Sequence, residues 1–140
     1  MKSPIIPTLL SLFAALSLTN VALAANNTHK PSGRYCGKVL SSGEMSNVET
    51  SFEMNASNGA VVGSYVFAEK AQPVDGVLAE AGDDGDGNEL TRTFIWRDKY
   101  GYGKLDVTFT PNFSEFEGKW SDGGPNLLPW NGARCGALST

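Results

Sequence analysis

The sequence has few of the residues on which most catalytic sites depend. It contains a single histidine, His29, and two cysteines among 140 residues. One histidine argues against Ser-His-Asp and Cys-His catalysis and against histidine-based metal sites. No glycine-rich phosphate loop leads from a strand into a helix. We therefore expect a protein that is not an enzyme and holds no cofactor and no metal. Paired carboxylates, drawn from 15 acidic residues, leave acid–base hydrolysis as the alternative.

Long apolar runs and basic clusters are also scarce. The one apolar run, residues 5–18, follows Lys2 and precedes Ala22-Leu23-Ala24, as in a secretory signal peptide with its cleavage site. The run is shorter than the ~20 residues of a membrane span. We expect a signal peptide over residues 1–24, a protein exported to the periplasm or the extracellular space, and no membrane span in the mature chain.

The charge balance argues against nucleic acid as a partner. The formal net charge is −4, and loss of Lys2 with the signal peptide makes it −5. No basic patch remains in the mature chain, whereas nucleic-acid-binding proteins carry one.

The two cysteines, Cys36 and Cys135, stand near the two ends of the mature chain. An even number of cysteines in an exported chain predicts a disulfide, with two free thiols as the alternative. A bridge requires the two Cα atoms to lie within about 7 Å of each other. The first and last parts of the domain should therefore be neighbours in space.

Helical periodicity is absent, and strand signals recur instead. We expect a flexible lead-in over residues 25–32 and a single domain over residues 33–140. Asn58-Gly59 is the strongest short hairpin signal. Leu105, Val107 and Phe109 alternate with polar residues, which indicates one buried face. The expected strands are 33–40, 50–56, 60–68, 73–80, 89–97, 103–110, 115–121 and 130–137.

Eight short antiparallel strands predict an all-β fold. We expect an up-and-down (meander) barrel with one disulfide, Cys36–Cys135, and a two-sheet sandwich is the alternative. Glycine recurs inside the expected strands, as in Gly63-Ser64-Tyr65 and Gly118-Lys119-Trp120. Glycine within a strand marks a bend or a close approach of backbones, and small barrels need such bends to close.

The segment from Asn58 to Trp120 resembles the avidin and streptavidin family, and more broadly small secreted barrels of the lipocalin kind. The similar stretches, in family order, are NGAVVGSY, VDGVL, AGDDGDGNEL, TFIW and FEGKW. The resemblance implies that Tyr65 takes the place of a tyrosine that binds biotin and that Trp96 walls the pocket. Phe67 stands where the family has a hydroxyl residue, and the strands that carry two further pocket tryptophans are missing. Biotin is therefore not the expected ligand.

Aromatic and charged residues at expected loop tips are the candidates for binding a partner. Exposed apolar loop residues tend to mark protein contacts. We therefore expect a binding protein that holds a protein partner, of the inhibitor or immunity type, through its loops. The candidate contact residues are Arg97, Lys99, Tyr100, Tyr102 and Trp130.

Three other hypotheses remain open. A small ligand or a sugar could bind in the barrel between Tyr65, Trp96 and Trp120, in which case a cavity of several hundred Å³ should lie between these rings. A secreted effector with an unknown target is the second. A loose Ca²⁺ site is the third, weaker than a solvated loop. Its candidate ligands are Asp84, Asp86 and Asn88.

Overall fold

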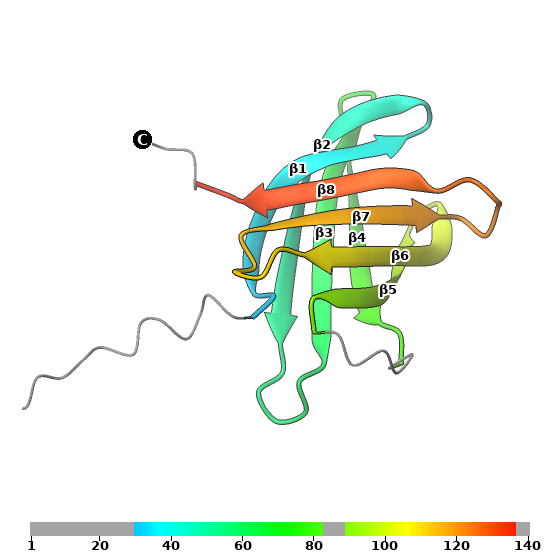
Figure 1. Cartoon of the computed structure of the whole chain (residues 1–140). Coiled ribbons are helices and arrows are strands. Elements are labelled where there is room, and N and C mark those ends of the chain that lie inside the picture. The colour runs from blue at the N-terminus through cyan, green and yellow to red at the C-terminus, as the bar shows by residue number, and fades with distance from the viewer. Residues whose placement is uncertain (1–29, 83–88, 137–140) are drawn as a thin grey trace, which may run out of the picture.

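The fold is a closed eight-stranded antiparallel barrel (Figure 1). The structure, a computed structural model, describes residues 30–82 and 89–136. Each strand pairs with the next in sequence, and β8 returns to pair with β1. The meander barrel is thus confirmed and the sandwich alternative is wrong. The strands are β1 (Gly33–Ser41), β2 (Glu44–Met54), β3 (Val61–Glu69), β4 (Gln72–Glu80), β5 (Thr91–Asp98), β6 (Gly101–Phe109), β7 (Glu115–Ser121) and β8 (Leu128–Arg134).

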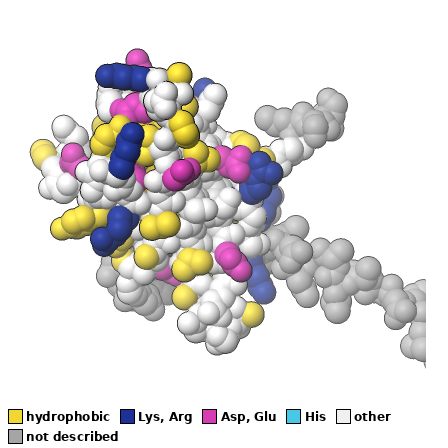
Figure 2. All heavy atoms as spheres, turned by 180° about the vertical axis from the view of Figure 1, so that it is seen from behind, with side chains coloured by type: hydrophobic (Ala, Val, Ile, Leu, Met, Phe, Trp, Pro, Cys, Tyr) yellow, Lys and Arg dark blue, Asp and Glu magenta, His cyan; other side chains and the backbone are white. Residues whose placement is uncertain are grey.

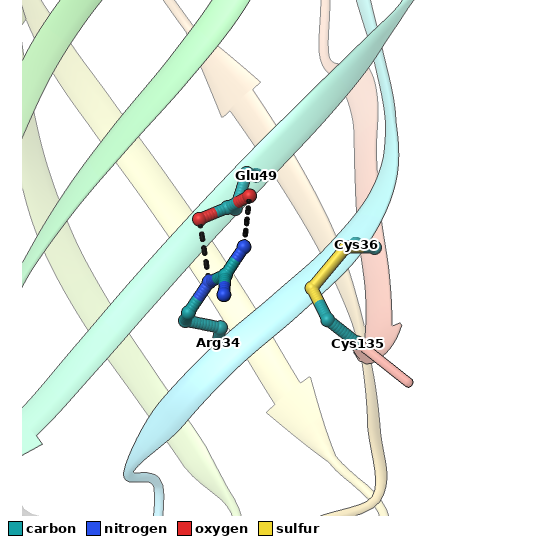
Figure 3. Close-up of a disulfide and its surroundings, with 4 residues drawn as sticks. All are labelled: Arg34, Cys36, Glu49 and Cys135. Carbon is teal, nitrogen blue, oxygen red and sulfur yellow. Dashed lines mark hydrogen bonds and ion pairs between the residues drawn. A yellow bond between two sulfur atoms is a disulfide. The ribbon is translucent and has the colours of Figure 1, made fainter. Parts of the chain in front are cut away.

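A disulfide fastens the seam between β1 and β8. The two strands pair from Tyr35 opposite Arg134 to Val39 opposite Trp130. Cys36 and Cys135 are bonded across this seam with their Cα atoms 5.0 Å apart (Figure 3). The predicted bridge between the first and last strands is therefore confirmed.

One end of the barrel is filled by aromatic rings. The Tyr35 hydroxyl donates a 2.6 Å hydrogen bond to the backbone carbonyl of Phe113, which ties the β6–β7 loop over this end. Pro31 is fully buried, and Arg134 donates to the carbonyls of Lys30 and Ser32. Residues 30–32, which we expected in the flexible lead-in, therefore contact the barrel. The rings, with neighbouring centroids 5.3–5.9 Å apart, belong to Tyr35, Phe52, Phe94, Phe109, Phe113 and Phe116.

The outer wall of the barrel is mixed in character. Seen from behind, apolar side chains lie among charged and polar groups (Figure 2). Exposed apolar residues on the strands include Val62 on β3 and Val77 on β4, each 54% exposed. Within residues 30–82 and 89–136, no helix has the length and hydrophobicity that crossing a membrane requires.

The structure corrects the expected position of Trp130. We expected this residue both at the start of the strand 130–137 and as an exposed contact at a loop after Pro129, but β8 already begins at Leu128 and Trp130 is 3% exposed inside the barrel. Proline lacks the N–H that a ladder requires. Pro129 is tolerated because it pairs with Lys119 of β7 but lies one residue beyond the pairing between β8 and β1.

Candidate binding site

A cavity of about 440 Å³ opens at the end of the barrel opposite the aromatic cluster. The connections that follow β1, β3, β5 and β7 lie at this end, at the upper right in Figure 1. Its floor and walls are inward-facing side chains of the strands, and its rim includes Ser42 and Tyr100 in two of the turns. We call this space the mouth cavity.

Aromatic rings form most of the wall of the mouth cavity. Trp96 and Trp120 meet edge to face with centroids 5.5 Å apart, and Tyr65 and Trp130 do so at 4.7 Å. Tyr65, Trp96 and Trp130 are no more than 6% exposed, and Trp120 is half-buried. The three residues of the ligand hypothesis are thus brought together around one cavity, which is the arrangement that this hypothesis requires.

Glycines on the neighbouring strands make room for two of these rings. Gly76 lies opposite Tyr65 in the ladder, and a Cβ there would come within 2.0 Å of Tyr65 Cζ. Gly103 lies opposite Trp96, and a Cβ there would come within 2.8 Å of the indole Nε1. The rings therefore lie against bare backbone, which accounts for glycine at position 76. At Gly103 the carbonyl oxygen of Ser121, 2.0 Å from an added Cβ, excludes a side chain as well.

The indole N–H groups around the mouth cavity are all used within the protein. Each donates a hydrogen bond to a protein oxygen, so that each ring is held in one orientation. These bonds, each 3.0 Å long, run from Trp96 to the carbonyl of Ser121, from Trp120 to the carbonyl of Leu40, and from Trp130 to Thr50 Oγ1.

Two carboxylates, Asp98 and Asp122, also line the mouth cavity. Asp98 accepts a 2.7 Å hydrogen bond from the Tyr65 hydroxyl and a 2.8 Å bond from the backbone N–H of Tyr100. Asp122 accepts a 3.1 Å bond from the backbone N–H of Gly124. Burial, reinforced by the hydrogen bond to Asp98, raises the pKa of Tyr65, so that this hydroxyl remains a donor.

The rim is tied together by polar contacts between hairpins. The Tyr100 hydroxyl, in the β5–β6 turn, donates to the carboxylate of Glu69 at the end of β3. Hydrogen bonds from Ser42 and Tyr100 lower the pKa of Glu69. The Lys99 ammonium lies 5.0 Å from the centroid of the Tyr100 ring. Three hairpins are thus linked at the entrance.

The residues expected to bind a protein partner separate into two groups. Arg97, Lys99, Tyr100 and Tyr102 lie together on the β5–β6 hairpin, where Tyr100 is 59% and Tyr102 67% exposed. The Arg97 guanidinium lies 5.5 Å from the centroid of the Tyr102 ring. Trp130 does not join them, because it forms part of the cavity wall. Its prediction as an exposed partner contact is therefore wrong.

The expected Ca²⁺ ligands Asp84, Asp86 and Asn88 lie outside the described residues, so that site stays a prediction. Elsewhere, Cys36, Glu49 and Cys135 bring three potential ligand atoms within 4.8 Å of one another. Both sulfur atoms are bonded in the disulfide, however, and a metal needs free thiolates. This cluster therefore holds no metal while the bridge is intact.

Our sequence reasoning missed Asp98, Asp122 and Trp130 as cavity residues. A usable signal was present for the two aspartates. Asp98 follows Trp96 by two positions and Asp122 follows Trp120 by two positions. Residues two apart on a strand share a face. Because each tryptophan is predicted to face inward, the aspartate two positions later should also face inward, at the mouth of the barrel.

Comparisons with known proteins provide no further guide to this site. No family model, no curated protein and no solved structure matches the chain. The resemblance to the avidin family stays an expectation, and the functional argument rests on the geometry of the mouth cavity.

Proposed function

We propose that the protein binds a small organic molecule in the mouth cavity. The observation that supports this most is that Tyr65, Trp96, Trp120 and Trp130 surround a space of about 440 Å³ at an open barrel end. Ligand pockets typically measure about 300–1,000 Å³ and combine aromatic walls with a few placed polar groups.

We propose binding without catalysis. The described residues that line the mouth cavity include no histidine, cysteine, lysine or arginine to activate a nucleophile. Its two carboxylates, Asp98 and Asp122, are the groups that the hydrolysis alternative would use, so an assay for turnover of the bound ligand distinguishes binding from catalysis. The disulfide supports an oxidising location outside the cytoplasm, in agreement with the expected signal peptide. The protein would then act as an exported carrier or scavenger of its ligand.

The test uses the protein's own fluorescence. The chain has three tryptophans, and all three line the mouth cavity. Intrinsic emission therefore reports on this site. The oxidised protein is screened against a small-molecule library that includes sugars, by thermal shift and by emission. We expect binders that raise the melting temperature and change the emission together.

A matched pair of variants locates the binding. Trp120→Ala removes a cavity wall, and Tyr102→Ala removes a ring of similar size from the outer face. We expect Trp120→Ala to weaken binding about tenfold or more, as loss of a buried aromatic contact does, and Tyr102→Ala to leave it unchanged. Binding that survives Trp120→Ala in full, or a library without any binder, would contradict the proposal.

A second candidate function is binding of a protein partner by the β5–β6 hairpin. It is favoured by two exposed tyrosines, Tyr100 and Tyr102, each with a cation over its ring. Tyrosine and arginine are enriched where proteins bind one another. The test is capture from exported proteins by wild type and by an Arg97→Ala/Tyr102→Ala variant, which leaves the cavity intact. A partner that the variant retains with equal affinity is not held by this hairpin.

A further inference from the structure

The polar groups of the mouth cavity are mainly acceptors. The three indole N–H groups donate to protein oxygens, as described above. The hydroxyl of Tyr65 donates to Asp98, and that of Tyr100 donates to Glu69. A carboxylate has about four lone-pair sites, so that Asp98 retains acceptor capacity after its two hydrogen bonds. A molecule entering the cavity thus meets ring faces, carboxylate oxygens and the hydroxyl of Ser41.

Among the described residues, neither carboxylate that lines the mouth cavity forms an ion pair with a basic side chain. The two hydrogen bonds from Ser42 and Tyr100 lower the pKa of Glu69, and the positive charges of Lys99 and Lys70, in the turns at this end, lower it further. Neither Asp98 nor Asp122 takes part in an ion pair within the described residues. The ion pairs there are Arg34–Glu49, Arg92–Glu80 and Lys104–Asp106.

The arrangement is built twice. Trp96-Arg97-Asp98 ends β5 at the open end, and Trp120-Ser121 ends β7 there, with Asp122 as the next residue. In both segments the tryptophan and the aspartate line the cavity, and the residue between them does not. Each segment therefore sets an indole in the wall and a carboxylate nearer the rim, where Asp98 is half-buried and Asp122 is exposed. Two aromatic rings with a carboxylate each are the elements from which proteins build sites for cations.

We infer that the ligand of the mouth cavity is a small organic cation, an amine whose ammonium group binds at Asp98, with Asp122 as a second negative charge at the rim, while its carbon skeleton lies against Trp96 and Trp120. This inference rests on the proposed function. The ammonium N–H groups donate to the carboxylate oxygens, and hydrogen bonds to a carboxylate are among the strongest in proteins. The ring faces add cation–π attraction.

The same groups discriminate against other ligands. An anionic ligand would bring its charge next to two unpaired carboxylates, and such like-charge contacts disfavour wrong partners. A neutral ligand would fill the apolar volume but leave the carboxylates without a countercharge. Selectivity for the cation therefore comes from attraction and from repulsion of its competitors.

The test uses three probes of nearly the same shape and different charge: 2-phenylethylammonium, 2-phenylethanol and 3-phenylpropanoate. Dissociation constants are measured by tryptophan emission and by calorimetry. We expect the ammonium compound to bind at least about tenfold more tightly than the alcohol, because a hydrogen-bonded charge pair contributes at least that factor. We expect no saturable binding of the propanoate.

Charge-removing variants test the residues. Asp98→Asn keeps the shape and one of the two acceptor oxygens that Tyr65 and the Tyr100 N–H use, and should weaken ammonium binding about tenfold while leaving the alcohol unchanged. Asp122→Asn tests the second segment independently if Asp98→Asn does not fold. Asp75→Asn removes the same charge from an exposed position outside the cavity, opposite Val66, and should change nothing.

The outcomes separate this inference from the proposed function. The inference of a cationic ligand is wrong if the alcohol or the propanoate binds as tightly as the ammonium compound, or if the library ligands that bind carry no positive charge. In either case the proposal that the cavity binds a ligand still stands. If both aspartate variants bind the ammonium compound as wild type does, the inference is likewise overturned. If neither the probes nor any library compound binds, both proposals fall.

Discussion

Thr50 is a small residue that we expect to contribute strongly to the stability of the fold. It is fully buried on β2, and its Oγ1 accepts the hydrogen bond of Trp130 Nε1 at 3.0 Å. Thr50→Val keeps the volume and removes the acceptor, leaving a buried N–H unsatisfied. We expect the free energy of unfolding to fall by about 1–3 kcal/mol.

Urea denaturation of the folded, oxidised protein measures this loss. The control is Thr108→Val on β6, which makes the same change at an exposed position. Equal midpoints for the two variants would show that the Trp130 indole finds another acceptor. Trp130 would then owe its orientation to packing alone.

Ionisation of Tyr65 should destabilise the folded protein at alkaline pH. Burial and the hydrogen bond to Asp98 raise the pKa of Tyr65 in the folded protein, whereas a tyrosine in the unfolded chain ionises near pH ~10. Above that pH the folded state holds a proton that the unfolded state has lost. The free energy of unfolding therefore falls as pH rises, and the contribution is fully present only below pH ~10.

Tyr65→Phe tests this dependence, because phenylalanine has no proton to lose. We expect its unfolding midpoint to fall less steeply than that of wild type between about pH 9 and about pH 11. Some slope should remain, since burial also raises the pKa of Tyr35. Parallel curves for the two proteins would refute the assignment.

At the scale of the element, the β3–β4 turn uses residues that do not suit its backbone. Lys70 and Ala71 have φ angles of 49° and 64°. Positive φ at both central positions is the geometry of a type I′ hairpin, which favours asparagine and glycine. Ala71→Gly relieves the clash of Cβ in this conformation. We expect it to raise the free energy of unfolding by about 1 kcal/mol.

Thermal denaturation followed by circular dichroism checks this gain. A change of that size moves the melting temperature by about 4–8 °C in a domain of this length. Gly43→Ala makes the opposite change at φ 78° in the β1–β2 turn and should lower the melting temperature. An unchanged or lower value for Ala71→Gly would contradict the expected strain.

The strands were more predictable than the turns. Alternation places Leu105, Val107 and Phe109 on one face, and all three are buried inside the barrel. Two-residue turns were harder to detect. β2 begins at Glu44 and not at residue 50, because Ser42 and Gly43 alone form the preceding turn. Lysine and alanine rarely adopt positive φ, so the sequence did not predict this turn at Lys70 and Ala71. The pairing of β3 with β4 imposes the turn geometry there.

The candidate site was predictable only in part. Tyr65, Trp96 and Trp120 follow from the inward phase of their strands. Whether inward rings pack solidly or leave a cavity depends on which strands oppose them, and this is decided by closure of the barrel. Trp130 was misplaced because a preceding proline reads as a loop, whereas the edge of the β1–β8 pairing accommodates Pro129.

At the scale of the whole molecule, the disulfide joins positions 99 apart in the sequence. Closing so long a loop stabilises the fold chiefly by limiting the unfolded chain, by up to ~4–5 kcal/mol. We expect the double variant Cys36→Ala/Cys135→Ala to lose a large part of this stabilisation, although its barrel should still close. Closure should persist because β1 and β8 remain paired from Tyr35 to Val39.

Guanidinium denaturation with and without a reducing agent measures the loss. Reduction should lower the midpoint of wild type to that of the double variant and should leave the double variant unaffected. Equal midpoints for oxidised and reduced wild type would mean that the bridge contributes nothing to stability. Its role would then be confined to the local geometry of the seam.

The position of the bridge also has a mechanical consequence. Cys36 lies in the first strand and Cys135 directly follows the last, on the seam shown in Figure 3. Tension applied to the two ends of the domain would pass from one sulfur to the other and bypass the strands between them. A pulled, oxidised barrel would lengthen only by the few residues outside the bridge. A reduced barrel would part at the β1–β8 seam and extend along its whole chain.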